Sequence, residues 1–153
     1  MKINFKKLIP EAKTPTKLHK PDAGYDFYCT SIEHNDNYII YHTGIAVDIP
    51  EGMVGLAFPR SSIIHKDLML KNSVGVVDSG YIGEIKFMFT DLKQQIIVPP
   101  YYNAATCIER KQYEVGDRIG QLIFLDLPEI TLIETDQLSE TDRGTGGFGS
   151  TNK

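Results

Sequence analysis

Cysteine is scarce in this sequence, which has only Cys29 and Cys107 among its 153 residues. Neither cysteine has a second cysteine or a histidine at the spacing of zinc ligands, so a structural zinc site is not expected. The first twenty residues also lack an apolar export signal. Two reduced, partly buried thiols are therefore favoured, with a single disulfide as the alternative.

Long apolar runs and an excess of positive charge are also missing. No run approaches the roughly 20 apolar residues that span a bilayer, and the lysine-rich N-terminus is broken by Pro10, Glu11 and Pro15 and has no arginine. We therefore expect no membrane contact and a cytoplasmic location, or the interior of a host cell if the source is viral. The formal net charge of −4 argues against nucleic-acid binding. It leaves room for a small anionic substrate held by a few arginines and a metal ion.

The composition is that of one globular domain, with 41% hydrophobic and 24% charged residues. Strand-like alternation appears at Ile3–Phe5 and at 44–50, 84–89 and 129–134, and the apolar run at 121–127 predicts a strand buried on both faces. A short helix is expected over Ser61–Leu70, with a serine as its cap. The pattern predicts an all-β sandwich, jelly roll or barrel with one short helix.

The stretch "RGTGGFGST" at 143–151 contains the pattern G-x-G-x-x-G. A dinucleotide site would need a preceding strand and a following helix, and the sequence stops too soon for that helix. The glycines can instead bring backbone N–H groups onto an anion, while Arg143 and the hydroxyls of Ser150 and Thr151 add donors. Phe148 can stack on a base. We interpret 143–153 as a flexible flap that orders over a nucleotide, with a solvated tail as the alternative.

Two further stretches carry polar side chains beside predicted strands. "FPRSS" (58–62) places Arg60 and two hydroxyls after a strand, which suits an anion site but also a surface arginine beside a capping serine. "NSVGVVDSGYIGEIKF" (72–87) reads as a hairpin in which apolar neighbours suggest a partly buried, functional Asp78. Taken alone, Asp78 is better explained as a turn residue before glycine.

Two other stretches are equally ambiguous when taken one at a time. "GDRIGQLIF" (116–124) is a turn leading into a core strand with one polar member, Gln121, which needs hydrogen-bond partners if buried. "AGYDF" (23–27) places Asp26 between aromatic residues after a turn of small residues.

Taken together and in order, these stretches resemble the five motifs of the homotrimeric dUTP diphosphatases (dUTPases). The resemblance runs from Ala23 to Thr151 and rests on "AGYDF", "PRSS", "NSVGVVDSGYIGE", "DRIGQLIF" and "RGTGGFGST". It implies a β jelly roll over 1–142, with 143–153 as the flap of the same domain. It also implies a homotrimer whose three active sites lie at subunit junctions, each built from all three chains.

The resemblance implies hydrolysis of dUTP to dUMP and pyrophosphate, which keeps uracil out of DNA and supplies dUMP for dTMP synthesis. Asp78 is then the general base for a water that attacks the α-phosphorus, and the ring of Tyr81 excludes a 2′-hydroxyl. The implied nucleoside-binding residues are Asn72, Gly75, Val76, Val77, Tyr81, Lys86 and Phe148. The implied phosphate-binding residues are Arg60, Ser61, Ser62, Gln121, Arg143, Gly149, Ser150 and Thr151.

The implied cofactor is Mg²⁺, held mainly by substrate phosphates, with Asp26 near the metal through water. An ion that keeps several waters and binds phosphate oxygens needs no protein cage, which agrees with the lack of a dense carboxylate cluster in the sequence. Three departures from the family pattern stand out. Phe27 replaces the usual leucine, Gly120 replaces the usual alanine, and the stretch 91–110 is long and could serve as a partner surface.

Two alternative functions follow from the same motifs. A dCTP deaminase of the same fold would carry a catalytic glutamate ten residues after Asp78, where this sequence has Met88. Methionine cannot act as a general base, so deamination is disfavoured. A dUTPase-like protein that acts by binding a regulatory partner is the other alternative, although every implied site position keeps its chemical type.

Overall fold

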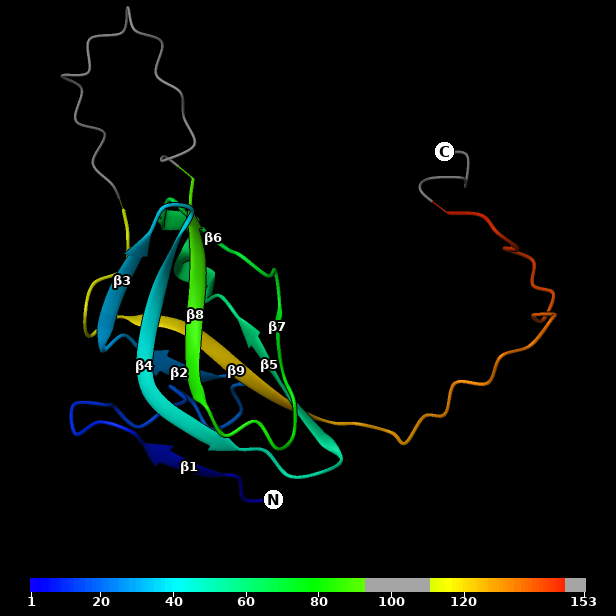
Figure 1. The fold of residues 1–153 in the computed structure, drawn as a ribbon, viewed down its shortest axis with the longest axis horizontal. Helices are drawn as coiled ribbons and strands as arrows, with labels where there is room; N and C mark the ends of the chain where they lie inside the picture. Colours follow the sequence, from blue (N-terminus) through cyan, green and yellow to red (C-terminus); the bar gives the residue numbers. More distant parts are fainter. Residues whose placement is uncertain (93–110, 148–153) are drawn as a thin grey trace, which may run out of the picture.

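The computed structural model describes residues 1–92 and 111–147, which form two antiparallel β-sheets packed face to face (Figure 1). The first sheet has the order β1 (Asn4–Lys7), β4 (Tyr38–Asp48), β8 (Glu84–Asp91) and β6 (Leu68–Leu70), and β3 (Ser31–Asn35) pairs with β4. The second sheet has the order β2 (Tyr25–Tyr28), β9 (Arg118–Asp126), β5 (Met53–Phe58) and β7 (Gly75–Val77). The prediction of an all-β jelly-roll fold is confirmed.

The hydrophobic core fills the space between the two sheets. β4, in the middle of the first sheet, is buried along most of its length, because it has neighbouring strands on both edges and the second sheet packs over one of its faces. An aromatic cluster closes one end of the core, with the rings of Tyr41 and Phe89 5.7 Å apart and nearly perpendicular. Gly120 on β9 faces Phe87 on β8 so closely that a Cβ there would lie 2.0 Å from the phenyl ring. The ring thus occupies the space of the alanine methyl group that the motif usually carries.

The predicted helix over Ser61–Leu70 is wrong in type and length. Only a 3₁₀ helix, η1 (Ser61–His65), forms there, and none of its residues is buried. It lacks the apolar stripe that would hold a longer helix on the core. Leu68 and Leu70 are buried on either side of exposed Met69, and this alternation forms strand β6. Arg60 rather than a serine occupies the N-cap position, without a side-chain capping bond.

The predicted hairpin over 72–87 is also wrong, because its two β runs belong to different sheets. β7 pairs with β5, whereas β8 pairs with β4 and β6. The exposed turn between them carries Gly80 at φ +82°, a conformation that favours glycine, and leads the chain from one sheet to the other. A cavity lies between the two runs where a hairpin would have its ladder.

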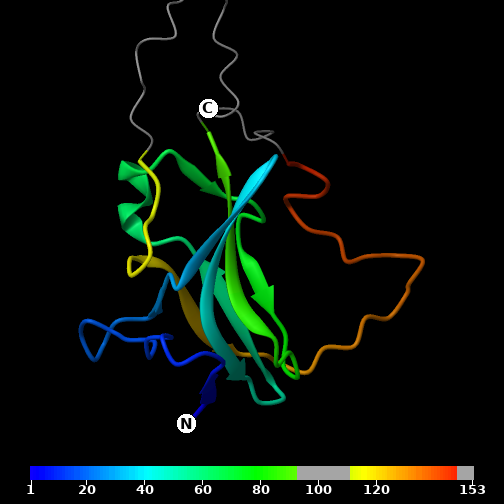
Figure 2. The ribbon, with the colours of Figure 1, turned by 60° about the vertical axis from the view of Figure 1, so that its left-hand side comes forward.

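The predicted strand over 129–134 does not form, and the outer end of the strand predicted at 121–127 is exposed. Within residues 1–92 and 111–147, the last hydrogen bond that ties the C-terminal segment to the rest of the fold is donated by the Leu127 amide to the Gly52 carbonyl, at 2.7 Å. Residues 128–147 then run away from both sheets as an extended arm (Figures 1 and 2). A β sequence needs a partner edge, and the arm meets none in the part of the chain that the structure describes.

Other sequence predictions concern cysteines, membranes and domain limits. Cys29 is buried in the core as a free thiol, and Cys107 lies outside the described residues, as does most of the stretch 91–110. Within residues 1–92 and 111–147, no helix is long and apolar enough to cross a membrane. The division at residue 142 stays a prediction.

Candidate active site

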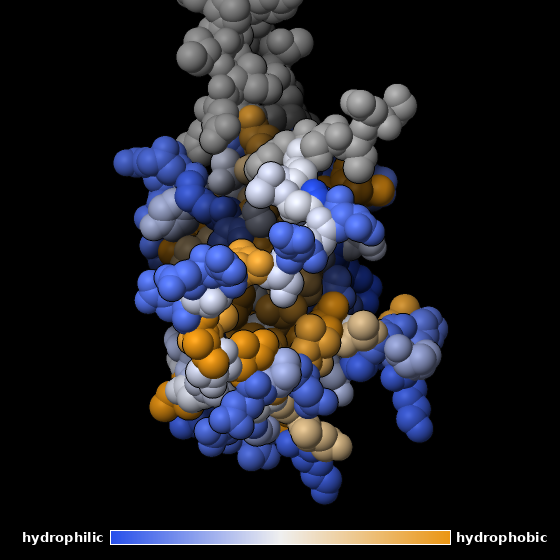
Figure 3. Space-filling model, turned by 90° about the vertical axis from the view of Figure 1, so that its right-hand side faces the viewer, coloured by the Kyte–Doolittle hydropathy of each residue, from blue (hydrophilic) through white to orange (hydrophobic). Residues whose placement is uncertain are grey.

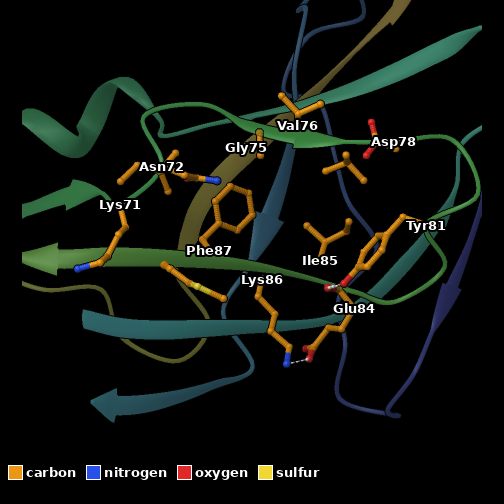
Figure 4. A pocket seen from close by; sticks show the side chains of 14 residues that line it. Lys71, Asn72, Gly75, Val76, Asp78, Tyr81, Glu84, Ile85, Lys86 and Phe87 are labelled. Atoms are coloured by element: carbon orange, nitrogen blue, oxygen red, sulfur yellow. Dashed lines mark hydrogen bonds and ion pairs between the residues drawn. The ribbon is translucent and has the colours of Figure 1, made fainter. Parts of the chain in front are cut away.

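A pocket of about 520 Å³ opens between β7 and β8 (Figure 4). On the side of the molecule where β7 lies, apolar side chains gather in and around a hollow, with polar side chains around them (Figure 3). Members of both sheets line the pocket, because the chain changes sheets between β7 and β8. The lining residues are Ala57, Leu70, Lys71, Asn72, Gly75, Val76, Val77, Asp78, Tyr81, Glu84, Ile85, Lys86, Phe87 and Met88.

Strand β7 presents its backbone to this pocket. It is the last strand of its sheet, with register pairs Gly55–Val77 and Ala57–Gly75 on one edge. Its other edge pairs with no strand of the described chain, so its peptide groups remain available to a planar ligand. Gly75 lets Ala57 and Asn72 pack close to β7, since a Cβ at position 75 would lie 3.0 Å from the Ala57 Cβ and 3.2 Å from the Asn72 amide nitrogen.

A tight turn places Asn72 at one end of the pocket. The Val74 amide donates to the Asn72 carbonyl at 2.6 Å, and the residue between them, Ser73, has φ +60°. Such a left-handed conformation is uncommon for a residue with a side chain and marks a backbone that its surroundings hold in place. The Asn72 amide points toward the cavity (Figure 4).

Asp78 and Tyr81 stand at the other end. Asp78 directly follows β7 and is exposed, so the expected partial burial is wrong in a single chain. The ring of Tyr81 lies on the backbone of Gly83, where a Cβ would come within 2.6 Å of the ring carbon Cζ. Its hydroxyl donates to the Glu84 carbonyl at 3.0 Å. The half-exposed ring of Tyr81 therefore lies near the Asp78 carboxylate and is held in place at its hydroxyl end (Figure 4).

Lys86 borders the pocket, but its ammonium group points away from it (Figure 4). Alternation along β8 sends Ile85 and Phe87 inward and Glu84 and Lys86 to the outer face of the sheet. There the Lys86 Nζ lies 3.7 Å from the Glu84 carboxylate. The ammonium group thus faces away from the pocket in a single chain, and the implied nucleoside contact of Lys86 stays a prediction.

A second polar cluster gathers at the ends of β2, β5 and β9. Asp26 on β2 accepts a bond from Arg60 Nε at 2.8 Å and one from Arg118 Nη1 at 3.0 Å, one on each carboxylate oxygen. The carboxylate is 13% exposed. Two guanidinium groups around one carboxylate leave a local excess of one positive charge, which suits an anionic ligand.

Ser62 and Gln121 complete this cluster. Arg60 Nη1 donates to the Ser62 hydroxyl at 3.3 Å, and the Gln121 amide donates to the Pro59 carbonyl at 3.1 Å. The expected partner for Gln121 is thus found, although its side chain is only partly buried. Gly24 makes room for it, since a Cβ there would lie 2.2 Å from Gln121 Oε1. Ser61 lies exposed at the start of η1.

The pocket and the cluster are separate places on one chain. The residues that line the pocket do not include Arg60, Ser61, Ser62 or Gln121. Arg143 lies on the arm, where its Nε donates to the Gly146 carbonyl at 2.9 Å. Phe148, Gly149, Ser150 and Thr151 lie outside the described residues. On one chain, the pocket and the cluster thus share no residue.

Sequence reasoning missed two residues that the structure places in these networks. Arg118 stands in the same motif as Gln121 and is the second partner of Asp26. Glu84 connects the pocket wall to β4. An arginine three residues before a predicted site residue, and a glutamate at the start of a strand, were signals that the sequence offered. Their partners lie far away along the chain, so the pairing itself was not visible.

Comparison with known proteins agrees with this geometry. A family model described as dUTPase matches residues 10–152. The deoxyuridine 5'-triphosphate nucleotidohydrolase of Rhodococcus erythropolis (strain PR4) is 37% identical over 154 residues, covering 98% of this chain and 85% of the relative. The dUTPase of Staphylococcus bacteriophage 80alpha, solved with dUPNHPP, is similar with a TM-score of 0.76 at 27% identity over 99% of each chain.

A further solved structure shows the fold. A mutant dUTPase from phage phi11 of S. aureus, described as coordinating a structural Mg(II) ion, has a TM-score of 0.71 at 24% identity over 92% of this chain and 100% of that one. Family model, relatives and fold agree over nearly the whole length, and four of the five motifs that carry the resemblance contribute to the pocket or to the cluster. The chain belongs to the dUTPase family, the deoxyuridine 5'-triphosphate nucleotidohydrolases.

Proposed function

We propose that different groups of residues in this chain bind the nucleoside, bind the phosphates and activate water in the hydrolysis of dUTP to dUMP and pyrophosphate. The pocket between β7 and β8 receives the deoxyuridine, and Asp78 at its end activates the attacking water. The observation that carries this proposal is the outer edge of β7, which pairs with no strand among residues 1–92 and 111–147 and whose peptide groups can hydrogen-bond uracil much as a base would. Asn72 at the turn adds an amide aimed at the same cavity.

Selectivity follows from the walls of the pocket. Cytosine carries an amino group, a donor, where uracil carries a carbonyl oxygen, an acceptor. Donors that are placed for uracil would then face another donor, and these unpaired groups lower the affinity for cytosine. The Tyr81 ring, tied down by its hydroxyl, takes the place where a 2′-hydroxyl would stand. Met88, where a deaminase of this fold would need a glutamate, lines the pocket and offers no proton acceptor. This favours hydrolysis over deamination.

The arginine cluster is proposed to bind the phosphate chain. Asp26 holds Arg60 through Nε, and the Ser62 hydroxyl accepts a bond from Arg60 Nη1. The remaining N–H groups of the Arg60 guanidinium are available to phosphate oxygens. Displacement at phosphorus depends on charge neutralisation and on an in-line water more than on covalent help. Arg60, Ser61, Ser62 and Gln121 therefore hold the substrate rather than react with it.

The proposed cofactor is Mg²⁺ that enters with the substrate phosphates. Among residues 1–92 and 111–147, no group of three or more His, Cys, Asp or Glu could hold a metal ion. Both oxygens of Asp26 already accept an arginine bond, so the structure offers this carboxylate as an orienting group and not as a ready-made metal ligand. Mg²⁺ would supply charge neutralisation on the phosphates. A contact to Asp26 through water stays a prediction.

We propose that a homotrimer brings the pocket and the cluster together. No residue of the cluster lines the pocket on one chain, which supports a site completed by a second copy. The arm supports assembly, because Ile130, Leu132, Ile133 and Leu138 are 71 to 94% exposed on a single chain. Residues 143–153 would then close over the nucleotide of a neighbouring site. A cytoplasmic location is proposed with this function.

A substrate panel tests the reaction. Purified protein with Mg²⁺ should convert dUTP to dUMP and pyrophosphate, and dCTP, dTTP and UTP should be turned over far more slowly. Asp78→Asn should abolish turnover while nucleotide binding, measured by calorimetry, persists. Equal turnover of dTTP, or ammonia release from dCTP, would contradict the proposal. Normal turnover by Asp78→Asn would assign the base elsewhere.

Subunit mixing tests the shared site. Asp78→Asn and Arg60→Ala should each be inactive, and an unfolded and refolded equal mixture should regain about a quarter of wild-type activity, because each site draws two residues from different subunits at random. No recovery in a mixture that forms trimers would place both residues on one chain. Truncation after Asp142 should remove activity and leave the trimer assembled, as measured by gel filtration.

A further inference from the structure

Glu84 joins three parts of the fold, and this junction reaches into the nucleoside pocket. Its carboxylate Oε1 accepts the amides of Thr43 at 3.1 Å and Gly44 at 2.8 Å. Its Oε2 lies 3.0 Å from His42 Nδ1. Its backbone carbonyl accepts the hydroxyl of Tyr81 at 3.0 Å. One residue thus contacts both the sugar-facing ring and the central strand β4.

The carboxylate replaces hydrogen bonds that the sheet itself cannot supply. The β4–β8 register shifts between the pairs His42–Lys86 and Ala46–Glu84, so β4 carries extra residues at this point. Such a bulge leaves amides without a ladder partner. Thr43 and Gly44 are buried there, and Gly44 has φ +64°. Their amides find the Glu84 carboxylate instead, which fixes the start of β8 against β4.

The carboxylate is ionised at neutral pH. Burial alone would raise the pKa of Glu84, but the hydrogen bonds from His42 and from the Gly44 amide, and the charges of His42 and Lys86, together lower it below its ordinary value of 4.5. An ionised acceptor forms stronger bonds to the bulge amides than a neutral one would.

We propose that Glu84 is a positioning residue that sets the enzyme's preference for deoxyribose over ribose. By holding the start of β8 on the β4 bulge, it fixes the carbonyl on which the Tyr81 hydroxyl rests, and so the ring that faces the sugar. This inference rests on the proposed function of Tyr81. Without the Glu84 carboxylate, the start of β8 is no longer hydrogen-bonded to the β4 bulge, and the Tyr81 ring can move aside to admit a 2′-hydroxyl.

The test compares kcat/KM for dUTP with kcat/KM for UTP in matched variants. Glu84→Ala should lower the dUTP-to-UTP ratio about tenfold or more, because a ring that moves no longer rejects the extra hydroxyl. Glu84→Gln keeps an acceptor for the bulge amides and should recover most of the ratio. Glu33→Ala is the control, since Glu33 lies 3.6 Å from the other ring nitrogen of His42 on the same face. It should leave the ratio unchanged.

Each result decides the matter. A folded Glu84→Ala trimer with the wild-type ratio, or one that loses dUTP and UTP turnover by the same factor, would overturn the proposal and leave Glu84 a structural residue. If Glu84→Ala does not fold, Glu84→Asp, whose shorter side chain cannot reach the bulge as well, must lower the ratio more than Glu84→Gln, or the proposal fails. A wild-type enzyme that does not hydrolyse dUTP, or that accepts UTP equally, would instead refute the proposed function.

Discussion

Replacing Gly83 by alanine should disturb the active site while leaving the fold intact. The Gly83 backbone has no special conformation that alanine would resist, but the new methyl group would lie 2.5 Å from the Tyr81 hydroxyl oxygen and 2.6 Å from Cζ. Ordinary contacts begin near 3.4 Å, so the ring must move by about 1 Å. That movement breaks the 3.0 Å hydrogen bond from Tyr81 to the Glu84 carbonyl.

The expected magnitude follows from this displacement. The lost hydrogen bond is worth about 1 kcal/mol, or roughly fivefold, and a misplacement of about 1 Å at a reacting site can cost up to about a hundredfold. We expect kcat/KM for dUTP to fall about 10- to 100-fold. The free energy of unfolding should change by less than about 1 kcal/mol, because the ring is half exposed and no core contact is lost.

The assay is steady-state kinetics with dUTP, together with thermal unfolding and gel filtration to confirm an assembled trimer. A double-mutant cycle with Tyr81→Phe separates the cause, since phenylalanine lacks the oxygen that makes the closest contact. Gly83→Ala should cost less in the Tyr81→Phe background than in the wild type. Kinetic constants within twofold of wild type would show that the ring does not rest on Gly83, and strictly additive losses would show that the Tyr81 hydroxyl has no part in the effect.

Three further predictions concern the core and the arginine cluster. Gly120→Ala should destabilise the fold by about 1–3 kcal/mol in urea unfolding, because its methyl group would meet the Phe87 ring, and Phe87→Leu should relieve the loss; an unchanged midpoint would contradict this packing. Burial, followed by the charge of Asp117, raises the pKa of Cys29 from 9.0 to about 11. Because the pKa is raised in the folded state, the stability that the protonated thiol contributes is fully present below pH 9 and is lost as the pH rises toward 11. The same shift lowers the thiolate fraction at pH 8 about a hundredfold. Iodoacetamide should therefore label the native Cys107→Ser variant at least a hundredfold more slowly than the unfolded chain, and similar rates would contradict the burial. Asp26→Asn should lower kcat/KM for dUTP about tenfold or more, because both arginines lose their charged partner; a loss under twofold would remove Asp26 from the orienting role.

Several features were predictable from local sequence because they depend on neighbours along the chain. Alternation predicted β8 and the C-terminal end of β4, and the order of short residue patterns predicted the motifs, since side-chain alternation and turn chemistry are local properties. Asp78, Tyr81 and Asn72 were named as site residues, and the structure places all three on one pocket. The helix at 61–70 failed because the alternation at Leu68 and Leu70 favoured a strand once β8 offered an edge.

By itself, the sequence determined the all-β class, the identity of the motif residues and the resemblance to a family, because composition and short-range patterns carry that information. Only the tertiary structure decided that β7 and β8 belong to different sheets, that Asp26 is held by Arg60 and Arg118, and that Glu84 anchors a bulge in β4. These contacts join residues 34 to 92 positions apart. Which distant groups meet depends on strand register and on how the sheets pack, and no local pattern encodes either.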